Sequence, residues 1–149
     1  MDELNWDEIA ERFSAARNWW VSTTGTGGPH AVPVWGVLAN SQLVFYGATS
    51  SKRSRNLALD SRVSVHLESG DSPLIIRGTA TPAGLAAQRP ELISAYQAKY
   101  TEPWDAEYLP DTPYGATVVS YNINPISAMA WSFAPSTEFT IRRWSAPKN

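Results

Sequence analysis

The chain has 149 residues, of which 43% are hydrophobic and 11% aromatic, and its formal net charge is −2. This length fits a single domain over residues 1–149 with a sizeable core, and the slight acidity gives no reason to expect binding to nucleic acid. The lack of cysteine excludes disulfides and a thiolate nucleophile, and the spacing of His, Asp and Glu fits no metal site. We find no apolar run long enough to span a membrane, and the first residues do not resemble a signal peptide. We therefore expect a cytoplasmic protein.

The first predicted element is an amphipathic helix. Asn5 can cap it, and Glu8, three positions later, completes the pattern of a capping box. Apolar residues then recur with helical spacing at Trp6, Ile9, Ala10 and Phe13. The helix should end near Ala16.

Most of the remaining chain has the pattern of β-strands, because apolar and polar residues alternate between turn-forming residues. The predicted strands cover residues 18–24, 30–39, 43–49, 62–69, 74–81, 116–133 and 137–144. The run 116–133 is one long strand or two, bent near Pro125. Strands joined by tight turns form antiparallel sheets, and closing such a sheet removes its exposed edges. We therefore predict a mainly β fold, a β-barrel with a few peripheral helices.

Two helical segments interrupt this pattern. Residues 52–59 predict a short helix, and residues 82–100 predict a helix that is broken or restarted around Pro90.

Residues 101–115 predict a loop rich in proline and acidic residues. Long irregular segments in compact domains are often lids or binding loops, so Trp104 and Tyr108 are candidate substrate contacts. The alternative is a plain connection that packs on the barrel through its aromatic side chains.

The stretch "GATSSKRSRNLALD" places three cations at the start of the short helix. Ser51 can cap that helix, whose first backbone N–H groups lack partners and attract anions. Lys52 and Arg55 lie three positions apart on one helical face, whereas Arg53 points about 100° away. We expect Lys52 and Arg55 to bind a phosphate and Arg53 to matter less. The alternative is a solvated helix face.

Hydroxyl groups precede these cations. Thr49, Ser50 and Ser51 can donate further hydrogen bonds to the same anion. The chain offers little catalytic equipment of its own, so a phosphate pocket here points to a phosphorylated cofactor that supplies the chemistry.

A second candidate region is "VPVWG". Proline removes a donor from a sheet ladder, so Pro33 should lie at an edge, at a bulge, or where another group approaches the backbone. With Val34 and Trp35 it would form a flat apolar wall suited to a planar ring. An ordinary edge strand with Trp35 in the core is the alternative.

The segments "GPHAVPVWGV", "LVFYGATSSKRSRNLALDSRVSVHLE" and "LIIRGTAT" resemble the split β-barrel superfamily of the pyridoxamine 5′-phosphate oxidase type. Within it, the chain is most similar to the flavin/deazaflavin oxidoreductases that use coenzyme F420. The resemblance covers residues 18–82 and resumes at "AMAWSF" and "TIRRW".

The resemblance implies a homodimer with two cofactor sites in grooves between its subunits. It assigns the cofactor phosphate to Ser51, Lys52, Arg55 and Asn56, and the cofactor ring to Pro33, Val34 and Trp35. It also assigns the closure of a site to Arg143 and Trp144. The T-R-W element of the family has a different spacing here, so the choice between the two adjacent arginines stays open.

The implied activity is hydride transfer from reduced F420 to an electrophilic small molecule, and no side chain is assigned as catalytic. Pyridoxamine phosphate oxidation itself is not expected, because the R-x-V-L-L-K and R-x-H elements of the true oxidases are missing. An FMN-binding oxidoreductase and a non-catalytic flavin- or haem-binding barrel remain alternatives.

Overall fold

The computed structural model describes residues 3–133 and 139–148. The strands are β1 (Asn18–Gly25), β2 (Gly28–Ala39), β3 (Gln42–Ala48), β4 (Arg62–His66), β5 (Leu74–Leu85), β6 (Val118–Ala130) and β7 (Arg142–Ser145). The α-helices are α1 (Trp6–Ala15), α2 (Lys52–Leu59) and α3 (Pro90–Lys99). Shorter 3-10 helices are η1 (Ala86–Gln88), η2 (Pro103–Tyr108) and η3 (Pro113–Thr117).

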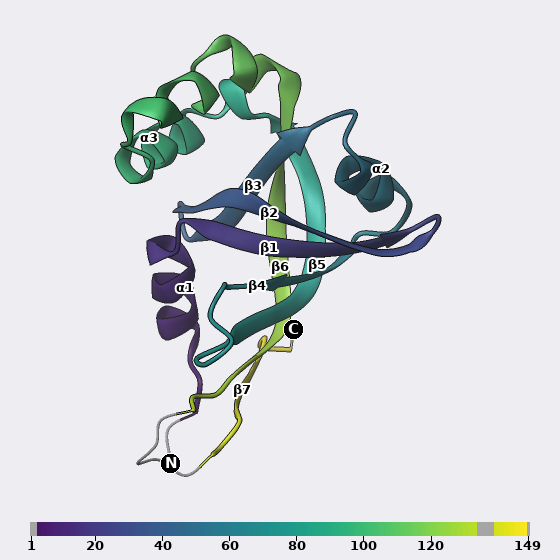
Figure 1. Ribbon diagram of the computed structural model, residues 1–149, viewed down its shortest axis with the longest axis vertical. Coiled ribbons are helices and arrows are strands. Elements are labelled where there is room, and N and C mark those ends of the chain that lie inside the picture. Colours follow the sequence, from purple (N-terminus) through teal and green to yellow (C-terminus); the bar gives the residue numbers. More distant parts are fainter. Residues whose placement is uncertain (1–2, 134–138, 149) are drawn as a thin grey trace.

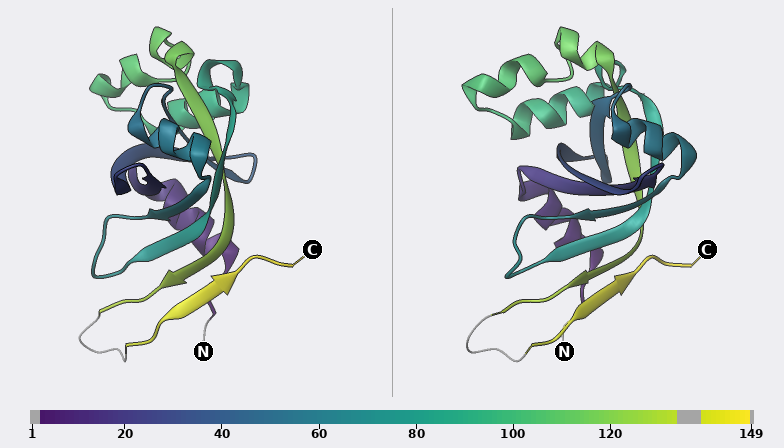
Figure 2. Two further views of the ribbon diagram at one scale, coloured as in Figure 1. Left: turned by 90° about the vertical axis from the view of Figure 1, so that its right-hand side faces the viewer. Right: turned by 45° about the vertical axis from the view of Figure 1, so that its right-hand side comes forward.

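The strands form an antiparallel barrel (Figure 1). Neighbours follow the order β3-β2-β1-β4-β5-β6, and a further pairing of β3 with β6 closes the sheet. β7 pairs with the far end of β6, and these two strands extend beyond the barrel (Figure 2). The predicted β-barrel with peripheral helices is confirmed.

The N-terminal helix forms as its sequence predicts. The Asn5 side chain accepts a hydrogen bond from the backbone N–H of Glu8 at 2.9 Å. Ile9 and Phe13 are fully buried and belong to the same core cluster as Trp19 and Phe45 of the barrel. Burying each such side chain stabilises the fold by about 1.5–3 kcal/mol, so α1 is held mainly by this apolar stripe.

Several boundaries differ from the predictions; β4, for example, ends at His66 instead of residue 69, and β6 covers Val118–Ala130 instead of 116–133. β5 continues to Leu85, because its end pairs with β6 at Val119, so the predicted helical region begins only after this strand. The predicted loop 101–115 contains the 3-10 turns of η2 and the start of η3. The last strand is shorter than residues 137–144, and the positions 137 and 138 lie outside the described residues.

The long strand β6 is continuous through Pro125 and carries a bulge there. Arg77 pairs with Ser127 and Gly78 with Pro125, so Ile126 is the extra residue. The backbones come so close that a Cβ on Gly78 would lie 2.2 Å from the carbonyl oxygen of Asn124. A bulge bends its strand locally, which accounts for the predicted bend.

Residues 86–117, which we call the cap, form a helical layer across one end of the barrel (Figure 1). Its buried side chains Leu92, Tyr96 and Tyr100 pack against Val37 and Val44 of the barrel in a second apolar cluster. α2 lies beside the barrel near β1 and β3. None of the described helices has the length and apolarity needed to cross a membrane.

Candidate functional site

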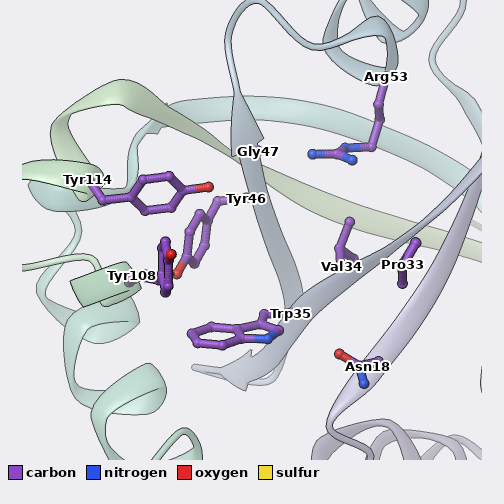
Figure 3. Close-up of a pocket in the computed structure, with 9 residues that line it drawn as sticks. All are labelled: Asn18, Pro33, Val34, Trp35, Tyr46, Gly47, Arg53, Tyr108 and Tyr114. Atoms are coloured by element: carbon purple, nitrogen blue, oxygen red, sulfur yellow. Dashed lines mark hydrogen bonds between the residues drawn. The ribbon is translucent and has the colours of Figure 1, made fainter. Parts of the chain in front are cut away.

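A cavity of about 410 Å³ lies where β2, β3, α2 and the cap meet (Figure 3). Its lining residues are Asn18, Pro33, Val34, Trp35, Tyr46, Gly47, Arg53, Tyr108 and Tyr114. This size lies within the range of small-molecule and cofactor sites, about 300–1,000 Å³. Its lining divides into a cationic end and an aromatic end.

Arg53 forms the cationic end. The residue is only 9% exposed, and among the described residues neither an ion pair nor a hydrogen-bond partner for its Nε atom exists. Figure 3 shows its guanidinium pointing from α2 into the cavity above Val34. Burial lowers its pKa, but a guanidinium stays protonated in proteins. A buried cation without a counter-charge is destabilising, so this group is suited to an anion that enters the cavity.

Gly47 provides the space for this guanidinium. A Cβ at position 47 would lie 1.8 Å from Nη2 of Arg53, far inside contact distance. The glycine at the end of β3 therefore determines where the cation can lie.

The aromatic end is built on Trp35. Its ring stacks on Tyr100 with centroids 4.1 Å apart and planes 8° apart, and the ring of Tyr108 meets it edge-on at 6.4 Å. Tyr114 in turn meets Tyr108 at 5.5 Å and 89°. In Figure 3, Trp35 forms a flat floor with Tyr108 and Tyr114 beside it. A planar ring can stack on such a surface.

Tyr46 joins this wall to the barrel. Its hydroxyl donates a hydrogen bond to the backbone carbonyl of Tyr108, and its pKa is raised by burial. The hydroxyl is therefore neutral at physiological pH and already engaged by the backbone.

The predicted ring-binding residues all reach the cavity. Pro33, Val34 and Trp35 line it, and Pro33 lies at a sheet edge, because β2 pairs with β3 only from Gly36 onward. The backbone of residues 28–35 is thus unpaired on one side within the described chain. The expected edge position of Pro33 is observed, and the approach of another group to this backbone stays a prediction.

The predicted phosphate-binding cations lie elsewhere. Lys52 donates to the carbonyl of Thr26 at 3.0 Å, and Arg55 donates to the carbonyl of Ser50 at 2.6 Å. Both side chains are exposed, and neither lines the cavity. α2 does separate position 53 from positions 52 and 55, as predicted, but it is Arg53 that faces the cavity.

The neighbouring polar residues have local partners. Ser51 caps α2 by accepting from the backbone of Ser54 at 3.1 Å, as predicted, whereas Thr49 and Ser50 are exposed. Asn56 is buried and donates to Thr23 Oγ1 at 3.0 Å.

The C-terminal pair lies on a different surface of this chain. Trp144 packs against Trp6 with ring centroids 5.1 Å apart. Arg143 and Trp144 line a smaller cleft of about 180 Å³ together with Arg77 and Ser127.

Of the two predicted substrate contacts, only one lines the cavity. Tyr108 does, whereas Trp104 is 67% exposed and does not.

The sequence predictions missed Arg53, Gly47 and Asn18 as cavity residues. One signal could have found the first: Arg53, Asn56 and Leu57 have helical spacing, and all three form the buried face of α2. A cation inside an otherwise buried stripe predicts a polar cavity beneath the helix.

Comparison with known proteins matches residues 6–124 to the family model described as "Pyridoxamine 5'-phosphate oxidase". No curated protein matches the chain significantly. Among solved structures, the conserved hypothetical protein Rv2991 from Mycobacterium tuberculosis is similar, with 23% identity, a TM-score of 0.68, and coverage of 89% of this chain and 90% of that one.

Two further structures share the fold at lower identity. PhzG from Burkholderia lata 383, solved in complex with tetrahydrophenazine-1-carboxylic acid, has 17% identity and a TM-score of 0.62, covering 97% of this chain and 84% of that one. A protein named F420 reductase has 17% identity and a TM-score of 0.57, covering 79% of this chain and 94% of that one.

Proposed function

The chain belongs to the pyridoxamine 5′-phosphate oxidase family, and we propose that it is an oxidoreductase that binds the deazaflavin coenzyme F420 in the Arg53 cavity. The observation that carries this proposal is the buried guanidinium of Arg53, which has no counter-charge among the described residues and points into a cavity with an aromatic floor. The substrate would be an electrophilic small molecule. The name of one structural neighbour, F420 reductase, supports this choice of cofactor.

The residues present fit such a cofactor. Arg53 would bind a phosphate, since a guanidinium can make paired hydrogen bonds to phosphate oxygens. Val34 and Trp35 would lie against the ring system, beside an edge of β2 that β3 does not cover within the described chain. One anion and one planar ring are the features that a flavin-type cofactor combines.

When bound, F420 supplies hydride chemistry, and the protein supplies the environment. Tyr108 and Tyr114 of the cap would shield one side of a bound ring from water, because they line the cavity beside the floor. Tyr46 keeps its proton, since burial raises its pKa and the Tyr108 carbonyl engages its hydroxyl. The chain's own residues therefore bind and orient, and we assign none of them as a proton donor.

A homodimer forms part of the proposal. On the outer face of the sheet, the pairings Pro33–Trp20, Trp20–His66, His66–Ile75, Ile75–Met129 and Met129–Arg143 make one continuous row. This row begins at the cavity rim and ends at Arg143. Two-fold packing of this face against a second copy would bring Arg143 of each copy toward the cavity of the other.

The test is titration of the purified protein with F420, FMN and haem, each followed by its absorbance spectrum. We expect stoichiometric binding of F420, tighter than that of FMN, and reduction of a test enone by the reduced cofactor. Stoichiometric binding of FMN without F420 would instead support an FMN enzyme of the same fold. Binding of haem alone, without enone reduction, would overturn the proposed activity.

A further inference from the structure

The aromatic wall of the cavity belongs to a larger arrangement among the described residues. Six rings contact one another in a closed circuit, with successive centroids separated by 4.1, 5.5, 4.6, 6.1, 5.5 and 6.4 Å. In order they are Trp35, Tyr100, Tyr96, Tyr46, Tyr114 and Tyr108. Trp35 and Tyr46 come from the barrel, and the other four come from the cap. The shape of the wall therefore depends on how the cap is seated.

An ion pair contributes to that seating, beside the apolar cluster under the cap and the hydrogen bond from Tyr46 to the Tyr108 carbonyl. Arg17, in the link between α1 and β1, donates from two nitrogens to the two carboxylate oxygens of Asp105, at 2.6 and 3.1 Å. Asp105 is fully buried in the cap and also accepts from the backbone N–H of Glu102 at 3.1 Å. The hydrogen bond from Arg17 lowers the pKa of this carboxyl.

The same guanidinium reaches the aromatic stack. Its Cζ atom lies 5.2 Å from the ring centroid of Trp35 and 5.4 Å from that of Tyr100. Arg17 thus contacts the barrel side and the cap side of the wall at once, while the Tyr100 hydroxyl donates to the Arg17 carbonyl at 2.7 Å. Ring contacts alone are weakly directional, whereas a two-pronged guanidinium–carboxylate pair has a defined geometry.

We propose that Arg17, through Asp105, is a positioning residue that fixes the orientation of Trp35 and so determines how well the cavity accepts a planar ring. This role rests on the proposed function, because it assigns the aromatic floor to a flavin-type ring. It separates two tasks in one cavity: Arg53 recognises the anion, and the Arg17–Asp105 pair shapes the surface for the ring.

The first test needs no ligand. The near-ultraviolet circular dichroism of Trp35 is obtained as the difference between wild type and Trp35→Phe. We expect Arg17→Met and Asp105→Asn to lose most of this signal, and Arg17→Lys, which keeps the charge but not the fork, to retain part of it. The matched control is Arg62→Met, which removes an equivalent guanidinium from the exposed pair with Asp60.

The second test uses FMN and riboflavin, which share a ring and differ by one phosphate. Arg17→Met should weaken both by the same factor, about three- to tenfold, so the ratio of their dissociation constants should stay constant. Arg53→Gln should weaken binding of FMN alone. The dissociation constant of riboflavin divided by that of FMN should therefore fall toward one. Measurements far below the unfolding temperature keep global stability out of the comparison.

The outcomes separate the two proposals. If Arg17→Met lowers only the unfolding temperature and leaves the Trp35 signal and both dissociation constants unchanged, the positioning role is overturned. If the Trp35 signal is lost but wild type binds neither flavin nor F420, the wall is positioned as inferred and the proposed function fails. A loss of FMN affinity without any loss of riboflavin affinity would also contradict the inference, because it would place Arg17 at the anion.

Discussion

Both faces of α2 carry cationic side chains, but the cation on one face is buried and those on the other face are exposed. Arg53 is buried and lacks a counter-charge among the described residues, whereas Lys52 and Arg55 are exposed and bonded to nearby backbone carbonyls. An exposed cation contributes little wherever it points, but a buried cation is destabilising until an anion meets it. Burial without a partner, rather than local charge density, is thus the better indicator of the ligand side.

The largest expected difference follows directly from this contrast. Arg53→Gln should weaken binding of a phosphate-bearing cofactor about ten- to a hundredfold, the equivalent of about 1.5–3 kcal/mol for one charged hydrogen bond. Lys52→Ala and Arg55→Ala should each have less than about a fivefold effect, because exposed charges contribute at most about 1 kcal/mol. Calorimetric titration of all three variants measures this. Equal, small effects from all three variants would contradict the proposal that a side chain of α2 binds the phosphate.

The opposite effect is expected on stability. Arg53→Met replaces an uncompensated buried charge with an apolar side chain of similar length, so the ligand-free protein should become more stable by about 1–3 kcal/mol. Urea unfolding without ligand measures the change. A clear loss of stability would show that Arg53 has a structural partner, and the binding role would then need another residue.

Gly47 gives a second way to displace the same guanidinium without removing its charge. Gly47→Ala places a methyl group on Nη2 of Arg53, so the cation must shift, and phosphate-dependent affinity should fall about tenfold. Gly70→Ala is the control, because a Cβ there meets nothing within 4 Å. Affinity for riboflavin, which has no phosphate, should change little in either variant.

Much of the fold was accessible from the sequence because it depends on local patterns. Strand alternation predicted the strands that form the barrel, and the Asn5–Glu8 spacing placed the first helix. The orientation of Arg53 was not accessible in the same way. Helical spacing separates it from Lys52 and Arg55, but which face meets the cavity depends on how α2 packs against β1 and β3. The cap was similarly undetermined, since its contact to Arg17 spans 88 positions.

Two ion pairs extend the comparison of buried with exposed charge to pH. Hydrogen bonds from arginine lower the pKa of both Asp105 and Asp60, but Asp105 is buried in the cap and its partner Arg17 is partly exposed. A lowered folded-state pKa stabilises the fold above the ordinary carboxyl value of 3.8, and this contribution is lost as the pH falls below it. Asp105→Asn should therefore lower stability at neutral pH by about 1–2 kcal/mol, discounted for the exposure of Arg17.

The measurement is the free energy of unfolding as a function of pH. Asp105→Asn should flatten the acid limb of the wild-type curve below pH 3.8, whereas Asp60→Asn should leave stability at neutral pH almost unchanged, because its partner Arg62 is 80% exposed. An unchanged acid limb in Asp105→Asn would show that this pair does not hold the cap.

The smallest expected effect concerns the cap's two candidate substrate contacts. Tyr108 lines the cavity and meets Trp35 edge-on, whereas Trp104 lies at the start of η2 and is 67% exposed. Tyr108→Ala is the informative change, because Tyr108→Phe keeps the ring. Tyr108→Ala should raise the substrate KM about three- to tenfold, since an aromatic contact contributes about 0.5–1.5 kcal/mol. The phosphate contact to Arg53 should stay intact. Trp104→Ala should leave KM and cofactor affinity unchanged. If instead both variants lower only the unfolding temperature, the aromatic side chains of this segment serve packing alone, and substrate selection must lie with the floor at Trp35 or with a second copy of the chain.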